Sequence, residues 1–329
     1  MSGTDEIELG EVTGGAYSSA DWPIAAGMLQ FAGINRDGGP ILEAPPAQWR
    51  SILSPVAYEG FTALELGNRW FDLTLAGEES RSALREVLDE LGLDVPGYIV
   101  AGRPITDAAR TAENLRYTHE SIDAAAAFGA RVLCIGLHPF SARRPGAPLW
   151  FWTEQDNVYD DDPAIYAELV SMLRELGRHS ADVGIELSVE LYPGTAVGTA
   201  ARAVQLISDI DLPSVGLNPD LGNYVRVQGP IEDWQDVVVA TLPLANYWHV
   251  KNYSRTEDPF AGTATTVPSG LDVGVVDYRK ALRFALARGF SGTIVTEHYG
   301  GDGIAVSAAN RDYLRRLLAA ILEEPLPRA

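Results

Sequence analysis

Short apolar runs alternate along this chain with longer segments in which apolar residues recur at every third or fourth position. A short run bounded by turn formers predicts a buried strand, and the longer spacing predicts an amphipathic helix. Strands are expected near residues 25–31, 63–66, 97–100, 132–137, 185–190, 215–220, 247–252 and 293–297. Helical spacing fills intervening or following segments such as 78–93, 107–130, 162–184, 275–290 and 307–324. The alternation predicts an α/β fold, a closed parallel (β/α)8 or TIM barrel in a single domain.

The two ends of this pattern and its two longest gaps set the expected domain organisation. Residues 1–23 are acidic and glycine-rich, so we expect an N-terminal tail before a barrel over residues 24–329. The connections 138–163 and 252–274 exceed the usual loop length, which predicts functional loops at the catalytic rim. The first carries Trp150, Phe151 and Trp152. Their rings would stack on a ligand or contact a partner, and packing against the core is a third interpretation.

Four strands of the second half end in a polar residue that is followed by turn formers. These residues are Glu190, Asp220, His249 and Glu297. Because side chains alternate across a strand, Glu190 is predicted to point inward with Ser188, and His249 with Tyr247 and Lys251. Three carboxylates and one imidazole at one rim predict a divalent metal site. Mn²⁺ is the first expectation, with Mg²⁺, Co²⁺ and Zn²⁺ as alternatives.

Composition narrows the class of protein further. The chain has 329 residues, 46% of them hydrophobic and 21% charged, which is typical of a soluble globular protein. Its net charge of -20 and its two lysines argue against nucleic-acid binding, which depends on clustered cations. The sequence shows neither a signal-peptide pattern nor an apolar run of about 18 residues, so we expect no membrane association and a cytoplasmic location. Cys134, the single cysteine, is predicted to be a buried thiol.

The four strand-end residues resemble the metal site of the xylose isomerase-like barrel superfamily, the sugar phosphate isomerase/epimerase group. The resemblance covers residues 25–322. Lys251 follows His249 in the H-x-K pattern of many members, and Arg255 stands where family epimerases carry an arginine. One departure is Asn223, three residues after Asp220, where epimerases and endonucleases of the group usually place a histidine. An amide can bind a substrate hydroxyl, but it exchanges no proton near neutral pH.

The resemblance implies an isomerase or epimerase acting on a sugar. A divalent ion would polarise the carbonyl of a sugar or oxo-sugar, and Glu190 and Glu297 would move the α proton. His138, at the end of its strand, and Lys251 are expected to be auxiliary catalytic groups. Arg255 and Asn223 are expected to bind the substrate, as are Trp150 and Trp152.

Two alternatives remain open at the level of sequence. In length, metal set and aromatic-bearing loop the chain also resembles the catalytic subunit of C-glycoside deglycosidases, which cleave the carbon–carbon link of 3-oxo-glucosides with a small β-rich partner. Elimination from the same intermediate would make the protein a lyase. The second alternative is a non-catalytic barrel that binds a sugar. The resemblance and the aromatic loop favour an oligomer, with or without a second subunit.

Overall fold

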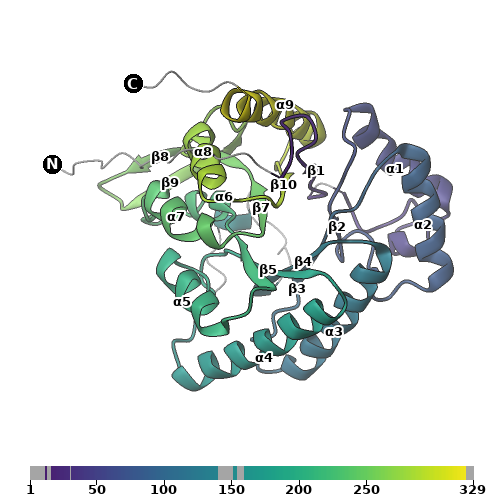
Figure 1. Cartoon of the computed structure of the whole chain (residues 1–329), viewed down its shortest axis with the longest axis horizontal. Coiled ribbons are helices and arrows are strands. Elements are labelled where there is room, and N and C mark those ends of the chain that lie inside the picture. The colour runs from purple at the N-terminus through teal and green to yellow at the C-terminus, as the bar shows by residue number, and fades with distance from the viewer. Residues whose placement is uncertain (1–11, 13–15, 30, 140–150, 154–158, 324–329) are drawn as a thin grey trace.

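The computed structural model describes residue 12 and residues 16–29, 31–139, 151–153 and 159–323. Eight parallel strands form its centre (Figure 1). They are β1 (Ile24–Ala26), β2 (Leu66–Gly67), β3 (Gly97–Gly102), β4 (Val132–Pro139), β5 (Glu186–Glu190), β6 (Val215–Asn218), β7 (Tyr247–Val250) and β10 (Thr293–Thr296). Each overlaps an expected run, so the prediction of eight strands is confirmed. The bounds differ most at β1, which ends at Ala26 and not at residue 31, and at β2, which shares only Leu66 with the expected run 63–66.

The strands close into a barrel. Five of them pair in the order β2-β3-β4-β5-β6 and three in the order β1-β10-β7, all parallel. Parallel bridges between Ala26 and Leu64 and between Leu217 and Ala245 join these two groups at both edges. The predicted TIM barrel is therefore correct, and the carboxyl ends of its strands meet at one rim.

Helices surround the strands on the outside of the barrel (Figure 1). They are α1 (Pro46–Tyr58), α2 (Glu78–Leu91), α3 (Thr111–Phe128), α4 (Pro163–Asp182), α5 (Ala200–Ile210), α6 (Leu221–Val225), α7 (Trp234–Thr241), α8 (Tyr278–Ala287) and α9 (Gly303–Leu322). Short 3-10 turns lie at Ile41–Glu43, Phe151–Thr153 and Leu242–Leu244. Local chemistry sets several boundaries: the carboxylate of Asp162 caps α4, and Gly92 ends α2 in the left-handed conformation.

Two apolar layers hold the fold together. A large core fills the space between the strands and the helices, and a small one fills the inside of the barrel. The inner cluster consists of Ala25, Ala63, Val132, Cys134, Tyr247 and Val295. Cys134 is buried there, as predicted, and burial raises the pKa of its thiol. Small side chains dominate this layer, which leaves room for polar groups nearer the rim.

The connection over residues 252–274 differs from the expected loop. Most of it is an antiparallel hairpin, β8 (Asn252–Asp258) paired with β9 (Thr263–Ser269). The alternating, threonine-rich run of β9 favours a strand, and Gly262 supplies a left-handed turn residue. The hairpin lies outside the barrel sheet. The other long connection is described only in part, at Phe151–Thr153 and from residue 159 onward.

The segment before β1 is anchored to the barrel where it is described. Trp22 is fully buried, stacks on Phe290 and donates an indole hydrogen bond to the carbonyl of Gly292 at 3.1 Å. The end of the predicted N-terminal tail therefore straps one end of the barrel, while residues 1–11 and 13–15 lie outside the described part. Among the described helices, none is long and apolar enough to cross a membrane.

Candidate metal centre

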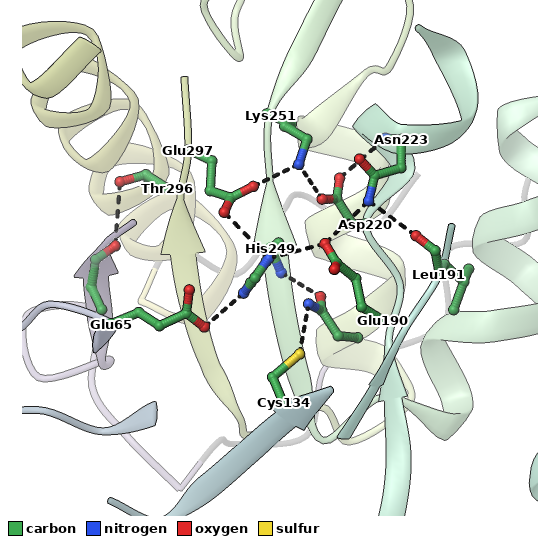
Figure 2. A network of polar contacts seen from close by, with 12 residues as sticks. Glu65, Cys134, Glu190, Leu191, Asp220, Asn223, His249, Lys251, Thr296 and Glu297 are labelled. Carbon is green, nitrogen blue, oxygen red and sulfur yellow. Dashed lines mark hydrogen bonds and ion pairs between the residues drawn. The ribbon is translucent and has the colours of Figure 1, made fainter. Parts of the chain in front are cut away.

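The four predicted ligands meet at the rim of the barrel (Figure 2). Glu190 is the last residue of β5, and His249 lies in β7. Asp220 caps α6 just after β6, accepting the backbone N–H of Asn223. Glu297 follows β10 directly. All four side chains are buried, as the alternation of the strands predicts.

His249 is the centre of this cluster. Its Nδ1 lies 3.5 Å from Oε1 of Glu190 and 3.5 Å from Oε1 of Glu297. Ligand atoms of Glu190, Asp220 and His249 all lie within 4.8 Å of one another. The backbone N–H of His249 donates to Oδ1 of Asn218 at 2.7 Å, which fixes the height of the imidazole in the barrel.

A fourth buried carboxylate, Glu65, contacts the other side of the imidazole. Its Oε1 lies 2.8 Å from Nε2 of His249. Glu65 precedes β2 and points inward like Ala63, two residues earlier, which belongs to the inner cluster. Ligand atoms of Glu65, His249 and Glu297 also lie within 4.8 Å of one another. Glu65 was not predicted from the sequence, because it stands inside an apolar run of the first half of the chain and not at a strand end. The inward alternation with Ala63 was the available signal.

Lys251 bridges two of the carboxylates. Its Nζ donates to Oδ2 of Asp220 and, at 2.6 Å, to Oε2 of Glu297. The amine is buried, so its charge compensates two acidic groups that water does not reach. Lys251 thus lies among the predicted ligands, and its catalytic role stays a prediction.

Burial and neighbouring charges set the pKa values of these groups. Burial works against the imidazolium of His249, but the charges of Glu65 and Glu297 outweigh it and raise the pKa of His249. Burial works against ionised Glu190 too, yet His249 and Lys251 lower its pKa, so Glu190 is a carboxylate at neutral pH. Burial raises the pKa of Asp220 to about 6 despite the opposing charge of Lys251.

Asn223 contacts a metal-ligand candidate directly. Its Nδ2 donates to Oε1 of Glu190 at 3.1 Å and to the carbonyl of Leu191 at 3.0 Å. Its Oδ1 is buried without a hydrogen-bond partner among the described residues. Asn223 therefore orients Glu190 and keeps an acceptor for a further hydroxyl.

His138 lies beside the cluster at the end of β4. Its ring stacks on Tyr192, with centroids 3.7 Å apart and an interplanar angle of 9°. Burial lowers the pKa of His138 to about 4, so this imidazole is neutral at pH 7. A neutral imidazole next to Tyr192 can accept a hydrogen bond from a substrate hydroxyl.

The predicted substrate-binding residues on the loops divide into three cases. Arg255 is turned away from the cluster: its guanidinium donates to the carbonyls of Val225, Val227 and Gly229 and to Glu257. Trp152 is buried close to the site. Its indole N–H donates to Oγ1 of Thr266 on β9 at 3.0 Å. Trp150 lies outside the described residues.

The donor set fits a divalent cation. Because Nε2 of His249 contacts Glu65, Nδ1 faces Glu190 and Glu297, and it has no hydrogen-bond partner among the described residues. A cation that takes the place of the Nδ1 proton would bind the lone pair at this position. Carboxylate oxygens and one imidazole nitrogen suit Mg²⁺, Mn²⁺ or a related ion. The acidic groups that raise the pKa of His249 stabilise positive charge at this position, so they also favour a bound cation.

Comparison with known proteins places this geometry in a family. The family model described as xylose isomerase-like TIM barrel matches residues 54–318. The chain belongs to the xylose isomerase-like TIM barrel family. This confirms the family resemblance seen in the strand-end residues. No curated protein matches the chain in sequence.

Solved structures give the same result. A xylose isomerase-like TIM barrel protein from Mycobacterium smegmatis, in complex with magnesium, is 38% identical, with a TM-score of 0.87 over 93% of this chain and 99% of that one. A 3-keto-D-glucoside 4-epimerase from E. coli is 17% identical, with a TM-score of 0.60 over 90% and 99%. A D-psicose 3-epimerase from Clostridium cellulolyticum H10 is 13% identical, with a TM-score of 0.59 over 92% and 97%. The last two likenesses show the fold.

Proposed function

We propose that this family member is a divalent-metal-dependent enzyme that removes a proton from the carbon next to the carbonyl of a sugar or oxo-sugar. One observation carries the proposal. Glu190 at the end of β5 and Glu297 just after β10 approach the same atom, Nδ1 of His249, at 3.5 Å each. Two carboxylates at one cation site can serve the two faces of a small substrate. The magnesium complex of the relative and the sugar epimerases among the structural neighbours support this function.

Each residue of the site would have its own role in this reaction. Glu190, Asp220, His249 and Glu297 would hold the ion. The bound ion would polarise the carbonyl and stabilise the enediolate. Glu190, ionised at neutral pH, would take the α proton, and Glu297 would pass a proton received from the ammonium of Lys251 to the opposite face or to the neighbouring carbon. Asn223 fixes the orientation of Glu190, and Lys251 supplies positive charge beside Glu297.

Proton exchange with solvent tests the roles assigned to Glu190 and Glu297. Purified protein is loaded with Mn²⁺ or Mg²⁺ and incubated in deuterated water with ketoses, inososes and 3-oxo-glucosides. Deuterium at the α carbon is then followed by NMR. We expect exchange with at least one substrate, reduced by about a hundredfold or more in both Glu190→Gln and Glu297→Gln. A matched control is Glu86→Gln, an exposed carboxylate on α2.

Two outcomes of this assay would contradict the proposal. Absence of exchange with every substrate in the metal-loaded protein would favour a binding role for the barrel. Exchange that persists unchanged in both glutamine variants would show that other groups move the proton. Metal content of each variant, measured by elemental analysis, separates loss of a base from loss of a ligand.

A second function has its own supporting observation. Rings of Phe151, Trp152 and Tyr299 pack on one another near the metal centre, with centroids 5.3–5.6 Å apart. A flat aglycone could stack on such rings. In that case elimination would follow proton abstraction, and the protein would act as a lyase on 3-oxo-glucosides with a β-rich partner. Release of the aglycone from a 3-oxo-C-glucoside, without interconversion of ketoses, would select this function.

A further inference from the structure

Arg226 is a buried cation that the metal centre does not use. It follows α6 and is only 2% exposed. Its backbone carbonyl accepts a hydrogen bond from Oγ1 of Thr266 at 2.8 Å, which ties it to the β8–β9 hairpin. The sequence gives no local signal for its role, because its surroundings come from distant segments of the chain.

Aromatic rings surround the guanidinium. The Cζ atom of Arg226 lies 5.0–5.8 Å from the ring centroids of four residues, Phe151, Trp152, Tyr192 and Tyr299. Cation–π contacts of this kind offset part of the cost of burying a charge.

Part of the hydrogen-bonding capacity of the Arg226 guanidinium is unused. Nη1 of Arg226 is buried and has no acceptor among the described residues. The ion pairs found in the described part of the chain do not include Arg226. A buried guanidinium without a carboxylate partner is costly, unless another molecule supplies the acceptor.

Tyr253 offers a second unused donor at the same place. It is 1% exposed, and its hydroxyl proton has no acceptor among the described residues. Its ring packs on Trp152, with centroids 5.3 Å apart. Burial raises the pKa of Tyr253, whereas the charges of Arg226 and Lys251 and a side-chain hydrogen bond from Arg226 oppose that rise, so the hydroxyl oxygen faces the guanidinium.

This donor pair lies next to the metal centre. The ring of Tyr299 has its centroid 5.8 Å from Cζ of Arg226 and 5.8 Å from Nζ of Lys251. Tyr192, which also faces Arg226, stacks on His138. A ligand a few atoms long could therefore touch Arg226 at one end and the metal ligands at the other.

We propose that Arg226 and Tyr253 bind a carboxylate group of the substrate, so that the substrate class is a sugar acid or another polyhydroxylated oxo-acid. This deepens and rests on the proposed proton-abstracting function. The planar guanidinium matches a carboxylate with two parallel N–H···O bonds, and the hydroxyl of Tyr253 adds a third donor. The aromatic rings exclude water from the pair, which strengthens each of these bonds.

A carboxylate fits these groups better than the other oxygen groups of sugars. A neutral hydroxyl would leave the buried charge of Arg226 unpaired. A phosphate carries up to two charges and is commonly bound by backbone N–H groups or several cations. Here the donors with no acceptor among the described residues are Nη1 of one guanidinium and one tyrosine hydroxyl.

Calorimetric binding tests the proposal without requiring turnover. The probes are D-glucuronate and D-galacturonate, each compared with D-glucose or D-galactose, which carry a hydroxymethyl group in place of the carboxylate. D-glucose 6-phosphate is the phosphate probe. We expect magnesium-loaded protein to bind a hexuronate at least tenfold more tightly than the matching hexose. Arg226→Gln should weaken hexuronate binding about 30-fold or more and hexose binding little.

Two further variants keep the test decisive. Tyr253→Phe retains the ring and should weaken hexuronate binding about three- to tenfold. Arg226→Lys retains the charge but loses the planar fork, and it carries the test if Arg226→Gln does not fold. Magnesium stoichiometry and circular dichroism should match the wild-type protein in each variant that is used.

Three outcomes would overturn the proposal. They are failure of both hexuronates to bind more tightly than the hexoses, unchanged hexuronate binding in the Arg226 variants, and a preference for the phosphate that those variants abolish. Unchanged binding in the variants would also reveal a carboxylate held by the metal instead. Calorimetry reports binding, and deuterium exchange reports proton abstraction, so either proposal can fail while the other stands.

Discussion

Oε1 of Glu65 lies 2.8 Å from Nε2 of His249, and both side chains are buried inside the barrel. This contact fixes the imidazole with Nδ1 facing Glu190 and Glu297. We predict that Glu65→Gln lowers the affinity for Mn²⁺ or Mg²⁺ by about ten- to a hundredfold, since groups that orient a ligand contribute that much to metal binding. Metal titration by calorimetry measures the change.

The control for this variant is Glu86→Gln, which removes one negative charge from the exposed face of α2. Its metal affinity should equal that of the wild-type protein. Equal affinity in Glu65→Gln as well would show that Glu65 does not orient the metal-binding imidazole.

A close approach between Gly97 and Tyr247 predicts a strong effect on stability. A Cβ atom added at Gly97, the first residue of β3, would lie 2.1 Å from the hydroxyl oxygen of Tyr247 and 2.6 Å from Cζ. The ring is fully buried in the barrel and cannot easily move aside. Gly97→Ala should therefore lower the free energy of unfolding by about 1–3 kcal/mol, measured by urea denaturation.

Gly229→Ala is the matched glycine variant. No atom lies within 4 Å of the added Cβ, and the backbone at Gly229 is not left-handed. Its unfolding free energy should stay within about 0.5 kcal/mol of the wild-type value. Similar losses in both variants would argue that backbone flexibility, not contact with Tyr247, decides the effect.

His138 predicts a pH dependence of stability. Its pKa falls from 6.5 to about 4 because burial opposes its charged form. The folded state binds fewer protons than the unfolded state between these values. The contribution to stability is therefore complete above about pH 6.5 and is lost as pH falls toward 4. The loss amounts to about 3 kcal/mol.

His138→Phe isolates this contribution because phenylalanine keeps a ring against Tyr192 but cannot titrate. The difference in unfolding free energy between the variant and the wild-type protein should shift by about 3 kcal/mol in favour of the variant between pH 8 and pH 4. A constant difference across this range would contradict the expectation.

Arg255 predicts a local effect on the β8–β9 hairpin. Its guanidinium donates to three backbone carbonyls after α6, among them Val225 at 3.2 Å and Gly229 at 2.6 Å. Arg255→Gln loses these bonds, so amide hydrogen exchange in the hairpin should accelerate by about tenfold or more. Mass spectrometry of deuterated peptides resolves the hairpin from the barrel. A raised KM with unchanged exchange would support the substrate-binding role expected for this arginine from the family resemblance.

The alternation of side chains explains why the barrel and much of its site were predictable. In a parallel barrel the inward position, the strand end and the shared rim are all properties of a single strand, so Glu190 and His249 could be located one strand at a time. Lys251 was found in the same way. Glu65 obeys the same rule but stands beside apolar Leu66, within a short strand segment that shows no polar end.

Interactions between distant segments explain what could not be predicted. The surroundings of Arg226 combine Phe151, Tyr192 and Tyr299, which no local pattern relates to one another. Arg255 was predicted to bind substrate because family epimerases carry an arginine at its position. Its contacts in the structure depend instead on how the hairpin packs against the end of α6 and the residues after it. Turn chemistry and the β-branched residues of β9 could have indicated the hairpin, but its packing depends on the tertiary fold.

In the sequence the β8–β9 hairpin lies between two residues of the candidate metal centre, His249 and Glu297, and it does not join the barrel sheet. It carries Tyr253 and Thr266, which face the aromatic group around Arg226, while the barrel strands and the turns directly after them carry the ligand candidates. Substitutions or changes of length in the hairpin can thus alter which molecules fit without displacing the carboxylates of the candidate metal centre. Evolution of a new substrate preference on this barrel would need few substitutions, concentrated in the β8–β9 hairpin.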